Sequence, residues 1–272
     1  MSNIGKNVTI AETAKIGKNV TLRDGVIIED HVVIGDNCYI DYNTIIKENV
    51  TLGEDSFIGA NSILGEFLYD FFDGKTNKKH PLNIGAHALI RSGAIIYGDT
   101  EIGPYFQAGH RVTIREKTHM GAHVILGTLS DIQGDCQIGN YVHMHSNVHI
   151  GMKAILKDFV WIYPYVVLTN DPTPPSETLD GVTVESFAVV CTGTVVLPGL
   201  HIGQDALIGA GTTLTKDVPD MTIMVGNPGR AVGNVTKIKN DKGEQVYPWR
   251  YSFKRGMPWK DSDYDQYIAS KQ

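Results

Sequence analysis

The chain has 272 residues, with 24 lysines and arginines against 30 aspartates and glutamates, and a formal net charge of −6 at pH 7. This acidic balance, without any block of like charge, argues against nucleic acid and anionic membrane surfaces as partners. The polar start and the lack of an apolar run of about 18 residues predict a cytoplasmic protein, and three widely spaced cysteines do not predict a disulfide framework.

From Ile4 onward the sequence repeats every six residues. Each unit begins with an aliphatic residue, as in IGKNVT at 4–9, and the frame holds through Leu64. It resumes from Ile84 to Leu168, and a last run begins at Val184. Hexapeptide periods are typical of parallel β-helices. Three units make one coil, so the repeats predict an all-β parallel β-helix of ten to eleven coils, stacked about 4.8 Å apart.

Positions within the unit support this fold. The first position is aliphatic and the fifth is small or β-branched, as at Val8 and Val20, so both are expected to point inward. The fourth position is rich in Asn, Asp, Gly and His, as at Asn7 and Asn19. These residues tolerate the left-handed backbone conformation that a sharp corner requires.

The repeat divides the chain into a β-helix domain at 1–234 and a C-terminal extension at 235–272. Two segments must leave the prism as loops, at 65–82 and 170–183. The first contains four aromatic residues and Lys75, and we expect it to form a flap over a neighbouring cleft or a lid on its own surface. The second contains three prolines and should be a rigid excursion beside the same region.

Residues 18 positions apart should stack along the three corners of the prism. The first corner collects rings, namely His87, Tyr105, His123, Tyr141 and Phe159. The second collects Gly93, Arg111, Leu129, Asn147 and Tyr165. The third alternates in charge, with Asp99, Lys117, Asp135, Lys153 and Asp171. This third column predicts a solvated edge with ion pairs worth less than about 1 kcal/mol each.

The segment HMHSNVHIG (143–151) holds three histidines. In the six-residue frame, His143 and His145 point outward between the first two corners, whereas His149 falls on another face. His119 falls on the third face. The face that carries His143 and His145 is therefore expected to form a functional cleft, or alternatively a trimer interface in which rings stack.

Four segments together resemble a known family: FQAGHRVTIREKTHMG (106–121), VHMHSNVHIG (142–151), LTNDPTPP (168–175) and VGNPGR (225–230). Over about residues 1–235 the chain resembles the hexapeptide-repeat nucleotide-sugar N-acetyltransferases, most closely those acting on dTDP-3-amino-3,6-dideoxyhexoses. The resemblance implies a left-handed β-helix and a homotrimer with clefts between subunits. It also implies transfer of an acetyl group from acetyl-CoA to the amine of a nucleotide-linked amino sugar, for lipopolysaccharide or S-layer glycan biosynthesis.

In such enzymes CoA lies parallel to the prism axis with its nucleotide near the C-terminal coils. The resemblance therefore implies that Lys216 and Arg230 bind phosphates beside the turn of Asn227 and Pro228. The remaining residues implied for CoA offer backbone amides to the pantetheine, namely Gly193, Gly209 and Ala210. This geometry places the thioester among residues near 120–150.

Acyl transfer requires a group that accepts the proton of the amine. A neutral histidine suits this task, and His123 is our first candidate as base or orienting group, with His145 and Asn147 as the second. In the alternative mechanism no protein base acts and the leaving thiolate takes the proton. The candidates for binding the nucleotide sugar are His110, Arg111, Arg115, His143 and Asp171.

The aromatic and basic segment at 247–259 is suited either to packing against the prism or to covering the adenine of CoA. Two other functions fit the same scaffold. One is a zinc enzyme like the γ-class carbonic anhydrases, but His149 cannot converge with His143 and His145, so we expect no metal site. The other is a non-enzymatic β-helix subunit of an assembly, which would not bind acyl-CoA.

Overall fold

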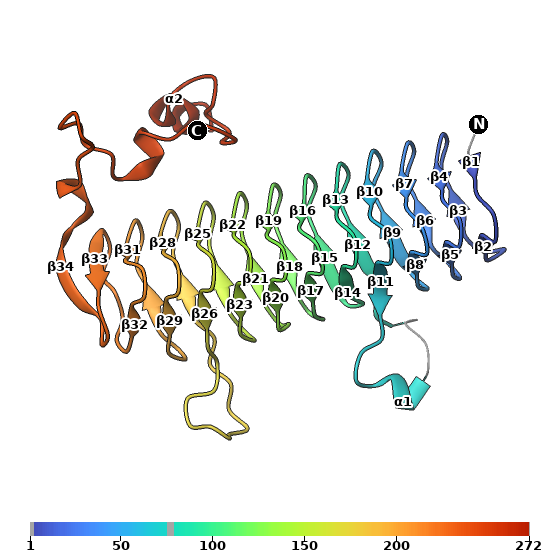
Figure 1. The fold of residues 1–272 in the computed structure, drawn as a ribbon, viewed down its shortest axis with the longest axis horizontal. Helices are drawn as coiled ribbons and strands as arrows, with labels where there is room; N and C mark the ends of the chain where they lie inside the picture. Colours follow the sequence, from blue (N-terminus) through green and yellow to red (C-terminus); the bar gives the residue numbers. More distant parts are fainter. Residues whose placement is uncertain (1–2, 75–78, 272) are drawn as a thin grey trace.

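The computed structural model describes residues 3–74 and 79–271, and these form stacked coils with a tail that folds back along them (Figure 1). Each coil contributes one short strand to each of three sheets, here called A, B and C. Except at the C-terminal end of sheet A, neighbouring strands are three apart in sequence and pair in parallel; for example, Ile125 pairs with His143 and Leu126 with Met144. The predicted all-β parallel β-helix is confirmed.

Sheet A has 13 strands. Its strands are β1 (Asn3–Ile4), β4 (Thr21–Leu22), β7 (Tyr39–Ile40), β10 (Phe57–Ile58), β13 (Leu89–Ile90), β16 (Gln107–Ala108), β19 (Ile125–Leu126), β22 (His143–Met144), β25 (Trp161–Ile162), β28 (Val189–Val190), β31 (Leu207–Ile208), β33 (Thr222–Val225) and β34 (Arg230–Asn234). The last pair, β33 and β34, is antiparallel. The fold has about 12 turns rather than ten to eleven, because β33 continues sheet A outside the six-residue frame.

Sheets B and C have 11 and 10 strands. Sheet B contains β2 (Thr9–Ile10), β5 (Ile27–Ile28), β8 (Ile45–Ile46), β11 (Ile63–Glu66), β14 (Ile95–Tyr97), β17 (Thr113–Ile114), β20 (Asp131–Ile132), β23 (His149–Ile150), β26 (Val167–Leu168), β29 (Val195–Val196) and β32 (Thr213–Leu214). Sheet C contains β3 (Lys15–Ile16), β6 (Val33–Ile34), β9 (Val50–Leu52), β12 (Leu82–Ile84), β15 (Thr100–Ile102), β18 (His119–Met120), β21 (Gln137–Ile138), β24 (Ile155–Leu156), β27 (Thr183–Val184) and β30 (His201–Ile202).

The interior of the prism is filled by the aliphatic first positions and the small fifth positions of the repeat. Ile40, Ile58 and Met144 are completely buried, as are Val26 and Val142. The polar corners have the left-handed backbone conformation that the sequence predicts, with φ of 55° at Asn7 and 57° at Asn61. Buried apolar area is the main favourable term in folding, so this continuous core holds the three sheets together.

Leu129 occupies one of these left-handed corners at a φ of 60° although its side chain is exposed. A β-carbon disfavours this conformation, and asparagine tolerates it better because its side chain bonds locally. We expect Leu129→Asn to raise the free energy of unfolding by about 1 kcal/mol and the β-branched Leu129→Val to lower it by a similar amount. Urea unfolding measures both, and equal midpoints for the two variants would contradict this account.

The first corner is a stack of rings, as predicted. Tyr105 and His123 lie 4.5 Å apart between ring centroids, and His123 and Tyr141 lie 4.4 Å apart. The third corner differs from its prediction, because no ion pair joins its charged side chains within the described residues. Lys153 instead donates to the carbonyl of Leu179, and Asp171 lies outside the column because the chain has left the prism there.

Both loops leave the prism after a strand of sheet B and return to sheet C, and they project from the same edge in Figure 1. The first runs from the end of β11 to the start of β12 and includes α1 (Phe71–Gly74). Its predicted range includes Lys75, which lies outside the described residues. At its base Lys47 pairs with Glu66 at 2.7 Å and lies 3.6 Å from the Phe67 ring centroid, so the base of the loop is fixed to its own prism.

The second loop lies between β26 and β27 and is organised by Asp171. This carboxylate accepts hydrogen bonds from the hydroxyl of Ser176 at 2.7 Å and from the backbone amide of Thr173 at 3.1 Å. The Ser176 hydrogen bond is the main reason why the pKa of Asp171 is lowered. The strand β27 begins at Thr183, so the loop ends before the predicted boundary.

After β34 the chain forms the tail, residues 235–271, which lies along the prism on the side away from the loops (Figure 1). It contains two 3-10 turns, η1 (Val235–Lys237) and η2 (Trp249–Tyr251), and the helix α2 (Tyr264–Ala269). Trp259 is completely buried and packs on Phe159 with ring centroids 5.1 Å apart. The aromatic segment therefore packs against the prism, which is one of the two roles predicted for it.

Candidate functional site

Four rings on sheet A form a continuous patch, here called the ring surface: His143, His145, Trp161 and Tyr163. Strand pairing places His143 directly beside Trp161 of the next coil, and their ring centroids are 4.3 Å apart. His143 stacks on His145 at 4.8 Å, and His145 stacks on Tyr163 at 4.7 Å. The predicted face is therefore present, with Met144 buried beneath it and completely inaccessible.

The tail covers part of the ring surface. The edge of Phe253 meets Trp161 at 5.5 Å between centroids, and Trp249 meets it at 6.0 Å. Two cavities lie between the tail and the prism, and both are lined by Trp161 and Phe253. The site therefore has walls from two parts of the chain that are about 90 positions apart in the sequence.

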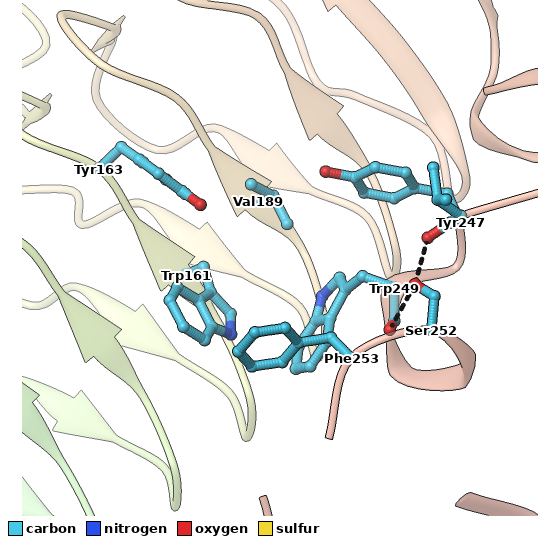
Figure 2. Close-up of a pocket in the computed structure, with 8 residues that line it drawn as sticks. Trp161, Tyr163, Val189, Tyr247, Trp249, Ser252 and Phe253 are labelled. Atoms are coloured by element: carbon cyan, nitrogen blue, oxygen red, sulfur yellow. Dashed lines mark hydrogen bonds between the residues drawn. The ribbon is translucent and has the colours of Figure 1, made fainter. Parts of the chain in front are cut away.

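The first cavity, here called the histidine cavity, has a volume of about 210 Å³. It is lined by His123, Ile125, Tyr141, His143, Trp161, Phe253, Arg255, Gly256 and Met257. The second, here called the tyrosine cavity, has a volume of about 240 Å³ and is shown in Figure 2. It is lined by Trp161, Tyr163, Val189, Val246, Tyr247, Trp249, Ser252 and Phe253.

The tail is held in place by a buried ion pair between Arg250 and Asp205, whose side chains are 11% and 3% exposed. The guanidinium also lies 4.5 Å from the ring centroid of Phe187. Beside it, the indole nitrogen of Trp249 donates to the carbonyl of Phe187 at 2.8 Å. These contacts fix the position from which Phe253 and Arg255 reach the histidine cavity.

Burial keeps the histidines of this face neutral. It lowers the pKa of His143 to about 4, with the neighbouring His145 as a second cause, because a charged imidazole loses hydration there. Burial also lowers the pKa of His123 and of His145. At neutral pH each ring therefore has one nitrogen free to accept a proton or a hydrogen bond.

The low pKa of His143 predicts a loss of stability in acid. The unfolded chain takes up a proton near pH 6.5, whereas the folded chain resists it until about pH 4. The free energy of unfolding should therefore fall as the pH drops through this range, by about 3 kcal/mol for this group. Urea unfolding of the original chain and of His143→Gln at several pH values measures this effect. Glutamine keeps a polar side chain at this position but does not take up a proton. Parallel curves for the two proteins would refute the assignment.

The structure brings two of the predicted residues, His123 and His143, to one cavity. His145 lies on the same face but does not line that cavity, and its Nε2 is buried without a hydrogen-bond partner in the described structure. Asn147 stands at the second corner with a φ of 57°, as predicted. His149 lies on sheet B and its Nδ1 is 3.2 Å from Asp131, so it is separate from the pair.

The other residues predicted to bind the nucleotide sugar lie away from the histidine cavity. His110 and Arg111 line a cavity of about 440 Å³ at the second corner. Arg115 pairs with Glu116 at 2.7 Å, and Asp171 organises its own loop. Within one chain these four residues do not line the cavity that contains His123. Their role in substrate binding stays a prediction, and it requires a second copy of the chain that brings them near His123.

The predicted CoA residues lie in the C-terminal coils. Asn227 and Pro228 form the turn between β33 and β34. Arg230 opens β34, with its guanidinium donating to the carbonyl of Gly229 at 2.9 Å, and Lys216 is exposed. Gly193 continues the second corner with a φ of 70°, and Gly209 and Ala210 lie on the next coil.

Residues 3–74 and 79–271 contain no group of three His, Cys, Asp or Glu side chains placed to hold a metal ion. The same residues include no helix of the length and apolarity needed to cross a membrane.

The sequence did not indicate that the tail lies over the ring surface and lines both cavities. Tyr247, Phe253 and Arg255 face the prism, although only their aromatic and basic character was visible in the sequence. The six-residue frame assigns every coil residue to a face, but it ends before the tail. Nothing in the spacing says which coils the tail covers, and the richness in aromatic residues is the one available signal.

Two family models match the N-terminal coils. Residues 2–46 match the hexapeptide repeat of succinyl-transferase, and residues 31–66 match the bacterial transferase hexapeptide of six repeats. The architecture corresponds to the left-handed β-helix of hexapeptide-repeat transferases. These matches concern the repeat and lie outside the coils that carry the ring surface.

Curated relatives are acetyltransferases. A 2,3,4,5-tetrahydropyridine-2,6-dicarboxylate N-acetyltransferase of Staphylococcus aureus is 28% identical over 101 residues, covering 37% of this chain and 36% of the relative. A serine acetyltransferase of Bacillus licheniformis is 42% identical over 67 residues, covering 24% and 31%. The chain thus spans about a third of the length of these relatives.

Among solved structures, LpxA from Acinetobacter baumannii aligns over 95% of this chain and 87% of its own, at 20% identity and a TM-score of 0.47. LpxA of Bacteroides fragilis, a UDP-N-acetylglucosamine acyltransferase, aligns over 93% and 86%, at 19% identity and a TM-score of 0.46.

Proposed function

We propose that the protein transfers an acetyl group from acetyl-CoA to the amine of a nucleotide-linked amino sugar, with a dTDP-3-amino-3,6-dideoxyhexose as the first candidate. The observation that carries this proposal is the histidine cavity, where neutral His123 and His143 line a space between the prism and the tail, beside aromatic rings. The acetyltransferase relatives and the hexapeptide repeat support the reaction class. The sugar acceptor rests on the sequence resemblance.

The chemistry requires a base of moderate strength next to the amine. The amine nitrogen attacks the thioester carbonyl carbon, the C–N bond forms, and the C–S bond breaks as CoA leaves as a thiolate. The ammonium proton passes to His123 and from there to the thiolate, so the histidine returns to its neutral form. His143, with a pKa of about 4, is too weak a base for this step and orients the acceptor by hydrogen bonding.

The second corner offers space for the pantetheine arm of CoA. A β-carbon added to Gly211 would meet no atom within 4 Å, and one added to Gly193 would have as its nearest neighbour the backbone nitrogen of Gly211, at 4.0 Å. An extended chain can therefore lie along these coils against exposed backbone. Arg230 and Lys216 would meet the phosphates of CoA, and a homotrimer would bring this corner toward the histidine cavity of a neighbouring copy.

The decisive experiment is mass spectrometry of the products formed from acetyl-CoA and a panel of acceptors. The panel contains dTDP- and UDP-linked sugars with an amine at C3 or C4, together with serine and tetrahydropyridine dicarboxylate, the compounds named in the relatives. We expect a mass gain of one acetyl group on an amino sugar nucleotide. Acetylation of serine or the dicarboxylate alone, or no acetylated product at all, would overturn the proposal.

A further inference from the structure

The tyrosine cavity has a composition that the acetyl transfer itself does not explain. Figure 2 shows the hydroxyls of Tyr163 and Tyr247 pointing toward one another across Val189, one from the prism and one from the tail. Neither hydroxyl has a hydrogen-bond partner among the described residues. Two unpaired hydroxyls that converge on a cavity are available to a ligand.

The lining of this cavity is aromatic and uncharged. Trp161, Trp249 and Phe253 form its walls and Val189 its floor, without a lysine, arginine, aspartate or glutamate. Burial raises the pKa of Tyr247 to about 12 and also raises the pKa of Tyr163, so both hydroxyls stay protonated at neutral pH. Such a cavity suits a flat, uncharged ring with hydrogen-bonding groups at its edge.

A cation lies next to this apolar space. Arg255 lines the adjoining histidine cavity, is exposed, and forms no ion pair with the described residues. Trp161 and Phe253 line both cavities, so a ligand with a ring in the tyrosine cavity would have to extend past these two rings to reach Arg255 and His123. A ring, then an anion, then an amine is the order of groups in a nucleotide-linked amino sugar.

We propose that the tyrosine cavity binds the base of a nucleotide, with Tyr163 and Tyr247 bonding the edge of the base and Arg255 meeting its phosphates. The inference deepens the proposed function, on which it rests, and it makes the tail part of the nucleotide site. The base can come from the acceptor or from the adenine of CoA. The position beside His123 favours the acceptor.

The test is calorimetric titration of the full chain, without acetyl-CoA, with dTDP, UDP, ADP and thymidine. Tyr163→Phe and Tyr247→Phe each remove one hydroxyl and keep the ring, and each should raise the Kd about tenfold. Tyr251→Phe is the matched control, since Tyr251 is an exposed tail residue outside the cavity and its variant should bind normally. Arg255→Gln should weaken dTDP binding and leave thymidine binding unchanged.

If dTDP or UDP binds more tightly than ADP, the cavity belongs to the acceptor. If ADP binds more tightly, the cavity belongs to CoA. Both results support a nucleotide site. Unchanged Kd values in both Tyr→Phe variants, or no binding of any nucleotide, would overturn it. The acetyl-transfer assay separates this result from the proposed function. Turnover of an amino sugar nucleotide with unaffected Tyr→Phe variants refutes the cavity alone, and binding without turnover refutes the transferase alone.

Discussion

His123→Ala is expected to lower kcat for acetyl transfer by about 10²-fold or more, because removal of a positioned base typically costs this much. His123 is held between the rings of Tyr105 and Tyr141 and lines the histidine cavity, so its position is fixed before substrate arrives. Its pKa is lowered by burial, which keeps it deprotonated at neutral pH. Steady-state kinetics with the acceptor identified by mass spectrometry measures the effect.

His87→Ala is the matched control for this variant. His87 belongs to the same stacked column, 4.6 Å from Tyr105, but it does not line the cavity. His145→Ala should have a smaller effect than His123→Ala, because His145 lies under Tyr163 and outside the histidine cavity. If His123→Ala and His145→Ala both keep nearly full turnover, no protein base acts and the leaving thiolate takes the proton directly.

The pH dependence of kcat separates a base from a structural role. A base that must be neutral gives a rate that falls in acid, with a midpoint below the usual histidine value of about 6.5. In His123→Gln this acid limb should disappear, although the side chain still fills the corner. A variant that merely disturbs packing would lower the rate at all pH values and keep the limb.

The β-helix could be predicted in detail because its rule is local. Each coil residue has a face that depends on its place in the hexad, so Met144 could be placed inside and His143 outside from the sequence alone. The same rule separated His149 from the pair. Where the chain leaves the frame the rule gives no information, and this is why Asp171 was placed on the charged column although it organises a loop.

The ring surface could be predicted from the sequence, whereas the position of the tail over it could not. The position of the tail depends on contacts such as that between Trp259 and Phe159, which join residues 100 positions apart. A local pattern cannot specify such a pairing, because any sufficiently apolar face would satisfy the aromatic residues of the tail equally well. The two cavities arise from this long-range packing, and with them the nearness of Arg255 to His123.

The position of the tail can be tested through its buried ion pair. Asp205→Asn is expected to release the tail from the prism, because it leaves the Arg250 cation buried without a counter-charge, at a cost of about 3 kcal/mol. Asparagine is the appropriate replacement since Asp205 has a φ of 58°, which asparagine tolerates. Trypsin should then cleave quickly after Lys254 and Arg255, while the far-ultraviolet circular dichroism of the prism stays unchanged.

Asp135→Asn is the matched control, at a corner with a φ of 52° and no ion pair in the described structure, and it should leave cleavage slow. The double variant that combines Asp205→Asn with Arg250→Met should again resist trypsin. The buried methionine carries no charge, so no unpaired cation remains in the interior. If trypsin cleaves Asp205→Asn no faster than the original chain, the Arg250–Asp205 ion pair does not hold the tail on the prism. If trypsin cleaves this variant quickly and the variant still acetylates its acceptor and binds nucleotide normally, the tail is not part of the site. Neither cavity would then be a functional site.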